Sequence, residues 1–300
     1  MRIEELLDNR MPTPVLESRY MVGEIIGEGA IGCVYAARDV VLGIDVAVKV
    51  MRHEHAHKAN VIERFHREAA LAARMLSPHV VKVLGMAVTR SGAPCIVYER
   101  LQGETLSERL ARKGTLTLTE TADIVKQIAR ALTRAHALGV IHQDVKPDNV
   151  FLVDEGGDRP LVKLIDFGIA ESIVGKDRPE QYELAGTPEY MAPEVLFGVS
   201  PPDSRSDLYA LGVVAFECLT GRCPFPGESF LEVLMGVRAG ALPSAAVLRP
   251  DLDDEIDEWM NRALHPDPFW RFASAKELGD ALDKVLRTAA PKRHVLRRAA

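Results

Sequence analysis

The spacing of apolar residues changes once along the chain, near residue 101, and this change limits the possible folds more than any other feature. Before it, alternating and β-branched segments are separated by glycines, as is typical of strands joined by turns. We predict strands at 20–26, 33–38, 44–51, 80–88 and 94–100. One helix is predicted among them, at 59–76, where the apolar residues at helical spacing are Phe65, Ala69, Ala72 and Leu76.

After residue 101 the apolar residues recur with a helical period. Long helices are predicted near 118–139, 205–220, 228–239, 253–264 and 274–288. A chain of 300 residues with 47% hydrophobic residues can form one large core or two modest ones. The sequence therefore predicts an α+β fold with two lobes, a small antiparallel sheet with one helix and a larger, mainly helical lobe.

Both ends of the chain differ in composition from these lobes. The first residues are polar and include Pro12 and Pro14, which indicates an extension before the folded region. The last residues are basic and are expected to form a solvated tail. The expected division is an extension, a small lobe, a large lobe and a tail, at 1–19, 20–101, 102–288 and 289–300.

Charge and composition exclude several classes of protein. A net charge of −6 argues against a nucleic-acid binder, because neutralising phosphates requires a concentrated basic surface. The 4 cysteines offer no C-x-x-C spacing, so we expect reduced thiols in a cytoplasmic protein. The longest strongly apolar run, 208–219, is shorter than the ~20 residues of a membrane span. Acidic residues interrupt the N-terminus where a signal peptide would be apolar, so no export is expected.

A glycine-rich segment, G-E-G-A-I-G, lies between the first two predicted strands. Without side chains at Gly27, Gly29 and Gly32, backbone N–H groups can approach phosphate oxygens closely. Glycines in such a place often serve only a tight turn, so the segment is a weak signal alone. A dinucleotide site would need a helix directly after the glycines, whereas the strand C-V-Y-A-A-R-D follows here.

The predicted strand V-A-V-K-V carries a candidate phosphate ligand, Lys49. Val48 and Val50 alternate with it and face the other side of the strand, and Ala47 is small enough to leave room for a flat ring. Glu68, on the one predicted helix of the small lobe, can pair with Lys49 and hold its ammonium toward a phosphate. A lone lysine on a strand usually faces solvent, so this interpretation depends on the motifs that follow.

The segment V-I-H-Q-D-V-K-P-D-N-V places Asp144 five residues before Asn149, and Asp166 opens the turn D-F-G after a short apolar strand. Carboxylate and amide oxygens on separate loops suit Mg²⁺, which takes a few such ligands together with phosphate and water. D-F-G alone is a common tripeptide. The order of the glycine loop, the lysine, the glutamate and the aspartates is hard to explain by chance.

This ordered set resembles the eukaryotic-type (Hanks-type) serine/threonine protein kinases. The resemblance covers about Tyr20 to Leu286, and the matching segments are G-E-G-A-I-G-C-V, V-A-V-K, Glu68, H-Q-D-V-K-P-D-N, D-F-G and A-P-E. It implies a bilobal protein kinase domain at 20–288 that transfers the γ-phosphoryl group of ATP to a serine or threonine of a protein substrate. The lysine two residues after Asp144, together with Thr187, resembles the Ser/Thr branch.

The resemblance also implies a role for each residue. Asp144 would accept the proton of the substrate hydroxyl, while Lys146 and Lys49 would neutralise phosphate charge. Mg²⁺, with Mn²⁺ as an alternative, would bind Asn149 and Asp166. ATP would be held by Gly27, Glu28, Gly29, Ala30, Ile31, Gly32, Val34, Ala47, Lys49, Glu68, Tyr98, Glu99, Leu101 and Phe151.

The resemblance implies two scaffold contacts as well: Asp207 would brace the backbone of the catalytic loop, and Arg271 would pair with Glu194. Some acidic residues can favour basic residues in a peptide substrate, although surface acids usually serve solubility. The candidates for this role are Asp148, Glu104 and Glu108.

Gln143 departs from the family pattern, which commonly has arginine before the catalytic aspartate to hold a phosphate of the activation loop. Gln143 has no charge and cannot form the bidentate ion pair that suits arginine to phosphate. The hydroxyl residues from 168 to 193 are few, namely Ser172, Tyr182, Thr187 and Tyr190. These features predict a kinase that needs no phosphate on its activation loop.

Two other functions fit part of the pattern. A pseudokinase, a binding or scaffold module with the same fold, would be expected to lack Lys49, Asp144 or Asp166, and all three are present. A small-molecule phosphotransferase of related fold would typically lack the A-P-E segment, which is present at 192–194.

Overall fold

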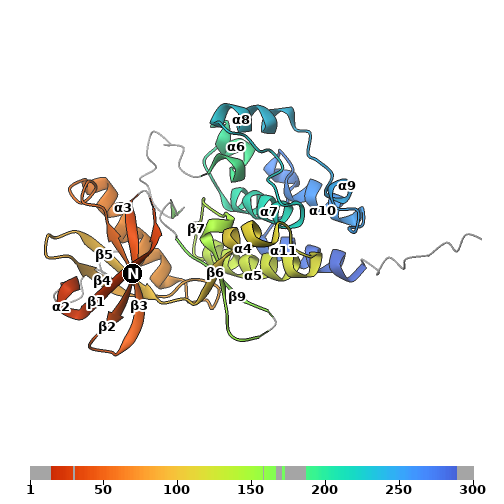
Figure 1. Ribbon diagram of the computed structural model, residues 1–300. Helices are drawn as coiled ribbons and strands as arrows, with labels where there is room; N and C mark the ends of the chain where they lie inside the picture. Colours follow the sequence, from red (N-terminus) through yellow and green to blue (C-terminus); the bar gives the residue numbers. More distant parts are fainter. Residues whose placement is uncertain (1–14, 30, 158, 167–170, 173–186, 289–300) are drawn as a thin grey trace, which may run out of the picture.

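A small lobe built on one sheet and a larger helical lobe make up the molecule (Figure 1). The computed structural model describes residues 15–29, 31–157, 159–166, 171–172 and 187–288. The sheet of the small lobe has 5 strands in the order β1-β2-β3-β5-β4, and all neighbouring strands are antiparallel. These strands are β1 Tyr20–Glu28, β2 Gly32–Asp39, β3 Ile44–Met51, β4 Val83–Val88 and β5 Pro94–Glu99.

Helix α3 (Ala59–Arg74) packs against the sheet of the small lobe through its apolar face. Phe65 and Ala69 are buried there, as the helical spacing predicts. The prediction that Leu76 belongs to this face is wrong. Met75 leaves the helical backbone angles, with φ −85° and ψ 76°, so the helix ends before it and Leu76 is 82% exposed.

Packing against the sheet begins before Tyr20. A short helix, α2 (Leu16–Arg19), precedes β1, and Leu16 is buried in an apolar cluster with residues of the sheet. The side chain of Arg19 pairs with Asp39 of β2 at 2.8 Å. The described part of the expected N-terminal extension therefore contributes to the core of the small lobe.

The large lobe follows β5 and contains the remaining helices and three short strand pairings. Its elements in chain order are β6 Gly103–Thr105, α4 Leu106–Lys113, α5 Leu118–Ala137, β7 Val140–Ile141, η1 Pro147–Asn149, β8 Val150–Val153, β9 Leu161–Leu164, β10 Glu171–Ser172, η2 Pro188–Tyr190, α6 Pro193–Leu196, α7 Ser204–Thr220, α8 Phe230–Ala239, α9 Ala245–Leu248, α10 Glu255–Ala263, η3 Pro268–Trp270 and α11 Ala275–Thr288. The long helices match the predicted ones to within a few residues. The prediction of a mainly helical second lobe is confirmed.

Helix α7 forms the centre of the large lobe because nearly all of its residues are buried. Its N-terminus is fixed by a capping box between Asp203 and Ser206, and Gly221 ends it in the left-handed conformation with φ 76°. Helix α10 ends close against it, since a Cβ atom on Gly212 would lie only 3.0 Å from Cδ2 of Leu264. This rigid helix carries Asp207 in its first turn, directly beneath the catalytic loop.

Strands β8 and β9 bring two loops with predicted metal ligands together. They pair antiparallel, with Val150 opposite Leu164, and the N–H of Ile165 donates to the carbonyl oxygen of Asn149 at 2.9 Å. Asn149 precedes β8 and Asp166 follows β9. Both residues therefore lie at the same end of this strand pair.

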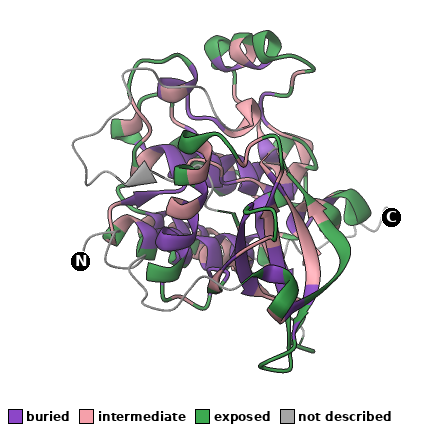
Figure 2. Ribbon diagram, turned by 90° about the vertical axis from the view of Figure 1, so that its left-hand side faces the viewer, coloured by how far each residue is buried: buried purple, intermediate pink, exposed green. Residues whose placement is uncertain are grey.

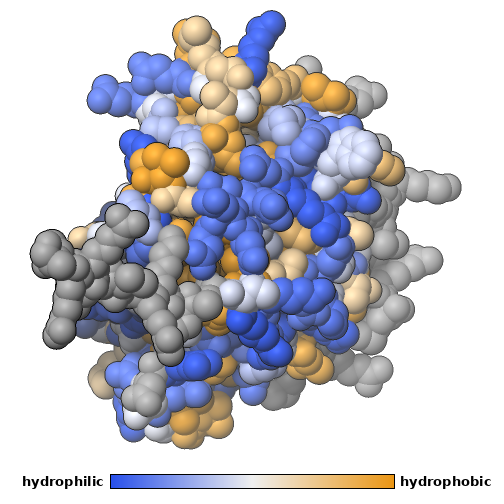
Figure 3. Space-filling view, turned by 90° about the vertical axis from the view of Figure 1, so that its right-hand side faces the viewer, coloured by the Kyte–Doolittle hydropathy of each residue, from blue (hydrophilic) through white to orange (hydrophobic). Residues whose placement is uncertain are grey.

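Buried residues gather in the interior of the molecule, and exposed residues cover the outer turns of the helices and the edges of the sheet (Figure 2). The face of the large lobe in Figure 3 carries hydrophilic side chains over most of its centre, with apolar groups scattered among them. Within the described segments, we find no helix that is both long enough and apolar enough to cross a bilayer.

A buried ion pair joins the beginning of α6 to the loop before α11. Both terminal nitrogens of Arg271 donate to Glu194, at 2.8 and 2.6 Å, and the two side chains are 0% and 8% exposed. The guanidinium also donates to the carbonyl oxygens of His265, Arg205 and Pro266. The contact that the sequence implied is confirmed, and each of the three nitrogens of the guanidinium donates hydrogen bonds.

We expect Arg271→Ala to lower the free energy of unfolding by ~3–5 kcal/mol, because Glu194 would be left as a buried, uncompensated charge. The matched control is Arg67→Ala on α3, which breaks an exposed pair with Glu63 and should change the free energy by less than about 0.5 kcal/mol. Urea denaturation measures both changes. Equal effects of the two substitutions would show that the buried pair contributes no more to the free energy of unfolding than the exposed pair does.

Candidate active site

Lys49 lies at the meeting point of the two lobes and contacts two carboxylates. Its Nζ atom is 2.9 Å from both Oε1 and Oε2 of Glu68 on α3, and 3.1 Å from Oδ1 of Asp166 after β9. Strand β3 presents Lys49 beneath the sheet, while Val48 is packed in the cluster on the opposite side. The predicted pairing of Lys49 with Glu68 is confirmed.

The electrostatics of this group keep Lys49 charged. Burial alone would lower the pKa of the ammonium, but Glu68 and Asp166 outweigh burial and raise the pKa of Lys49 above its ordinary value. Burial raises the pKa of Glu68, against the lowering effects of Lys49 and of the Tyr98 hydroxyl. A fixed positive charge in a largely dry site is suited to bind phosphate oxygens.

The catalytic loop, residues 142–149, is held from below by one carboxylate. Asp207 is 1% exposed, and its oxygens accept the backbone N–H groups of His142 and Gln143, each at 2.9 Å. Oδ2 is also 2.7 Å from Nε2 of His136 at the end of α5. The bracing role that the sequence implied for Asp207 is confirmed, and His136 is an addition that the sequence did not indicate.

The loop brings Asp144, Lys146 and Asn149 into one hydrogen-bonded group. Oδ2 of Asp144 lies 2.9 Å from Nζ of Lys146 and accepts from Nδ2 of Asn149 at 2.8 Å. Nζ of Lys146 also donates to the hydroxyl of Thr187 at 2.9 Å, which links the loop to the segment before A-P-E. A carboxylate and an ammonium are thus presented together beside a hydroxyl-bearing segment.

Two residues of the site have backbone angles that side chains rarely adopt. Among the described non-glycine residues, positive φ occurs only at Gln143 (67°) and Asp166 (62°). Such conformations cost on the order of 1–3 kcal/mol each and cluster at functional sites. Burial also lowers the pKa of His142, which favours the neutral form of its ring.

The residues expected around the adenine of ATP lie together below the sheet. One apolar cluster between the sheet and α3 contains Ile31, Val34, Ala47, Tyr98 and Leu101. Phe151 is half-buried on β8 and does not belong to this cluster in the part of the chain that the structure describes. Their role in binding ATP stays a prediction.

The backbone N–H of Glu99 already has a partner, because it donates to the carbonyl oxygen of Lys82. Its carboxylate accepts from the backbone N–H of Lys82 at 2.8 Å and from Nζ of Lys163 on β9 at 2.6 Å. Its backbone N–H is therefore not available for an adenine edge. Lys163 was not among the residues predicted for the site, although a single lysine within an apolar strand is a signal that could have indicated it.

The glycine loop connects β1 and β2, and its glycines serve different needs. A Cβ atom on Gly32 would lie 2.6 Å from the carbonyl oxygen of Val50, so only glycine fits there beside β3. Cβ atoms on Gly27 and Gly29 would meet nothing closer than 3.5 Å, so these two leave space open. Glu28 pairs with Arg52 at 3.5 Å, and Ala30 lies outside the described residues.

The donor set suits a hard divalent cation. Both amide hydrogens of Asn149 are used toward Asp144, at 2.9 and 2.8 Å, which leaves its side-chain oxygen as an acceptor. The Asp166 side chain is 45% exposed beside Lys49. No group of three His, Cys, Asp or Glu residues is arranged for a metal in the described ranges. Two protein oxygens plus phosphate and water are what Mg²⁺ prefers, so the residues present fit this ion.

Of the three acids proposed to favour a basic substrate, two are committed to contacts within the large lobe. Glu104 pairs with Arg109 at 2.7 Å and with Arg112 at 2.6 Å. Glu108 forms the capping box of α4 with Thr105. These partners could not be read from the sequence, and Asp148 is the one of the three that stays exposed without such a role in the described contacts.

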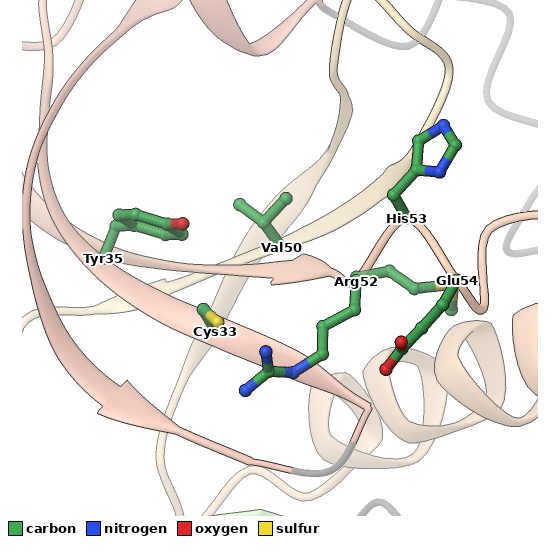
Figure 4. Close-up of a pocket in the computed structure, with 7 residues that line it drawn as sticks. Cys33, Tyr35, Val50, Arg52, His53 and Glu54 are labelled. Carbon is green, nitrogen blue, oxygen red and sulfur yellow. The ribbon is translucent and has the colours of Figure 1, made fainter.

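A separate hollow lies on the other side of β2 and β3 and is not part of the group around Lys49. Figure 4 shows its lining side chains around the end of β3, where Tyr35 and Cys33 come from β2. They alternate along the strand with Val34, which faces the apolar cluster below the sheet. This hollow therefore opens on the outer surface of the small lobe.

Comparison with known proteins agrees with this geometry. The model of the protein kinase domain matches residues 20–295. Serine/threonine-protein kinase PrkC of Bacillus subtilis is 33% identical over 88% of this chain and 40% of its own length. A probable serine/threonine-protein kinase PknB of Corynebacterium glutamicum is 36% identical over 92% of this chain and 44% of its own length.

Serine/threonine-protein kinase Pkn1 of Myxococcus xanthus is 37% identical over 87% of this chain and 37% of its own length. The chain thus spans about two fifths of the length of these relatives. The family match covers nearly all of the described residues, with the sheet, the helical lobe and the hydrogen-bonded groups of the site inside it. The chain belongs to the protein kinase family.

Proposed function

We propose that this chain acts as a serine/threonine protein kinase domain that transfers the γ-phosphoryl group of ATP to a protein hydroxyl. One observation carries the proposal: the Asp144 carboxylate is held between Lys146 and Asn149, and Lys146 also contacts Thr187. A base and a cation fixed side by side are what phosphoryl transfer to a hydroxyl requires. The names of the relatives support the Ser/Thr class.

In the proposed reaction, Asp144 orients the substrate hydroxyl and accepts its proton as the oxygen attacks the phosphorus. Lys146 stabilises the charge on the phosphoryl group during transfer, and Lys49 holds the remaining phosphates of the nucleotide. Mg²⁺, or Mn²⁺ in its place, would be bound by Asn149 and Asp166 and would neutralise phosphate charge. The pairing of Glu68 with Lys49 keeps the ammonium aimed into this space.

The substrate and the cellular setting follow from the same reasoning. The ion pair of Glu194 with Arg271 supports the segment beside Thr187, which suits a peptide better than a small acceptor molecule. We place the domain, residues 20–288, in the cytoplasm, where ATP is abundant and the 4 free cysteines stay reduced. The intact Lys49, Asp144 and Asp166 favour an enzyme over a pseudokinase.

Transfer of labelled phosphate from ATP and Mg²⁺ to a generic basic protein tests the activity. The wild type should label serine or threonine, and Asp144→Asn should lower kcat at least about 100-fold, because the general base is lost while the shape is kept. The matched control, Asp154→Asn, changes an exposed residue after β8 and should stay within about twofold. Labelling of tyrosine alone, or full activity of Asp144→Asn, would contradict the proposal.

We further infer that this kinase works without phosphate on its activation loop. The Nε2 atom of Gln143 is buried and has no hydrogen-bond partner among the described residues. An uncharged amide there needs no anion, whereas an arginine would leave a buried charge that only a phosphate or carboxylate could compensate. The contacts of Asp207 and of Lys49 supply the order that a phosphate would otherwise provide.

Treatment with a phosphatase tests this inference. The treated wild type, shown by mass spectrometry to carry no phosphate, should keep an initial rate within about twofold of the untreated protein. The double variant Ser172→Ala with Tyr182→Phe should behave alike, which excludes rephosphorylation during the assay. Loss of activity on treatment, with the removed phosphate mapped to Ser172 or Tyr182, would contradict the inference.

A further inference from the structure

The hydroxyl of Tyr98 forms a hydrogen bond that the reaction scheme above does not use. It donates to Oε1 of Glu68 at 2.6 Å, and the two residues are 8% and 3% exposed. The bond thus joins α3 to β5, an inner strand of the sheet that lies between β3 and β4. Tyr98 was assigned to the adenine pocket from the sequence, and its ring does line the apolar cluster there.

The hydrogen-bond capacity of Lys49 explains why this extra donor matters. An ammonium has three hydrogens, and in this structure Nζ of Lys49 has three oxygen neighbours, namely both oxygens of Glu68 and one of Asp166. A nucleotide phosphate that binds Lys49 must therefore take a share of these contacts. Glu68 would then lose part of its compensation while still buried, which is costly for a carboxylate.

Tyr98 can compensate for the hydrogen bonds that Glu68 would lose, because its hydroxyl donates to Oε1 independently of Lys49. Its hydroxyl comes from β5 in the small lobe, whereas Asp166 follows β9 in the large lobe. Helix α3 also packs against the sheet through apolar contacts such as those of Phe65 and Ala69. Such contacts set the distance of the helix but do not fix the direction of one carboxylate.

We propose that Tyr98 is a positioning residue that keeps Glu68 turned toward Lys49 while Lys49 binds phosphate. The proposal rests on the kinase function proposed above. It deepens that function, since it gives α3 a fixed active position through a bond within the small lobe. Phenylalanine at this position would keep the ring and the packing and remove only the donor.

Three side chains from separate elements shift the pKa of Glu68. They are Lys49 on β3, Tyr98 on β5 and Asp166 after β9. The pH dependence of kcat therefore reports on the contact of Glu68 with Tyr98. The hydroxyl of Tyr98 lowers the pKa of Glu68, so its removal should raise that pKa. Because the charged carboxylate holds Lys49, the fall of kcat on the acid side should then begin at a higher pH in the variant than in the wild type.

The test compares Tyr98→Phe with Tyr35→Phe, a matched control whose side chain lies at the outer hollow of Figure 4 and away from Glu68. In the full chain without nucleotide, hydrogen exchange of the α3 amides should be about tenfold faster in Tyr98→Phe and unchanged in the control. With ATP and Mg²⁺, kcat should fall about tenfold in Tyr98→Phe. The acid limb should shift upward in that variant alone.

A double-mutant cycle with Glu68→Gln separates a positioning role from general packing. If Tyr98 acts through Glu68, Tyr98→Phe should cost less than about twofold once Glu68→Gln is present. Equal loss of kcat in both backgrounds would overturn the proposal, as would unchanged α3 exchange in Tyr98→Phe. A wild type that transfers no phosphate would refute the proposed kinase function, while the exchange measurement would still decide the role of Tyr98.

Discussion

The carboxylate of Asp207 supports the loop on which the rest of the site depends. It is buried in the first turn of α7 and accepts the N–H groups of His142 and Gln143. Hydrogen bonds to a charged group contribute about 1.5–3 kcal/mol each, which offsets the roughly 1–3 kcal/mol cost of a positive φ at Gln143. The strained turn that presents Asp144 is therefore stable because the core of the large lobe holds it.

Strand β9 connects this support to the small lobe. Its Leu164 exchanges backbone hydrogen bonds with the segment before β4, through the carbonyl of His79 and the N–H of Val81. Its Lys163 pairs with Glu99 at 2.6 Å, and the next loop carries Asp166 to Lys49 at 3.1 Å. Strand β9 is thus one of the places where the lobes meet, and the candidate metal ligand Asp166 follows directly from it.

The sequence predicted what local patterns encode and, through the family resemblance, the distant contacts of Lys49, Asp207 and Arg271, but it missed distant contacts that no motif indicates. Strands and long helices followed from periods of 2 and 3.6 residues, because burial of one face is a local property of the chain. The prediction for Leu76 failed because periodicity does not detect where the backbone leaves the helix. The contacts of Tyr98 with Glu68 and of His136 with Asp207 join residues 30 and 71 positions apart. The spacing of residues along the chain cannot predict such contacts, because they form only when the fold brings the two segments together.

The two contacts that order the site, Tyr98 with Glu68 and Asp207 with the catalytic loop, involve no phosphate. In a kinase that uses arginine before the catalytic aspartate, an unphosphorylated loop would leave that charge without a partner. Gln143 removes this penalty, since a buried amide without a partner costs far less than a buried cation. The uncharged side chain of Gln143 therefore agrees with the proposal that this domain works without phosphate on its activation loop.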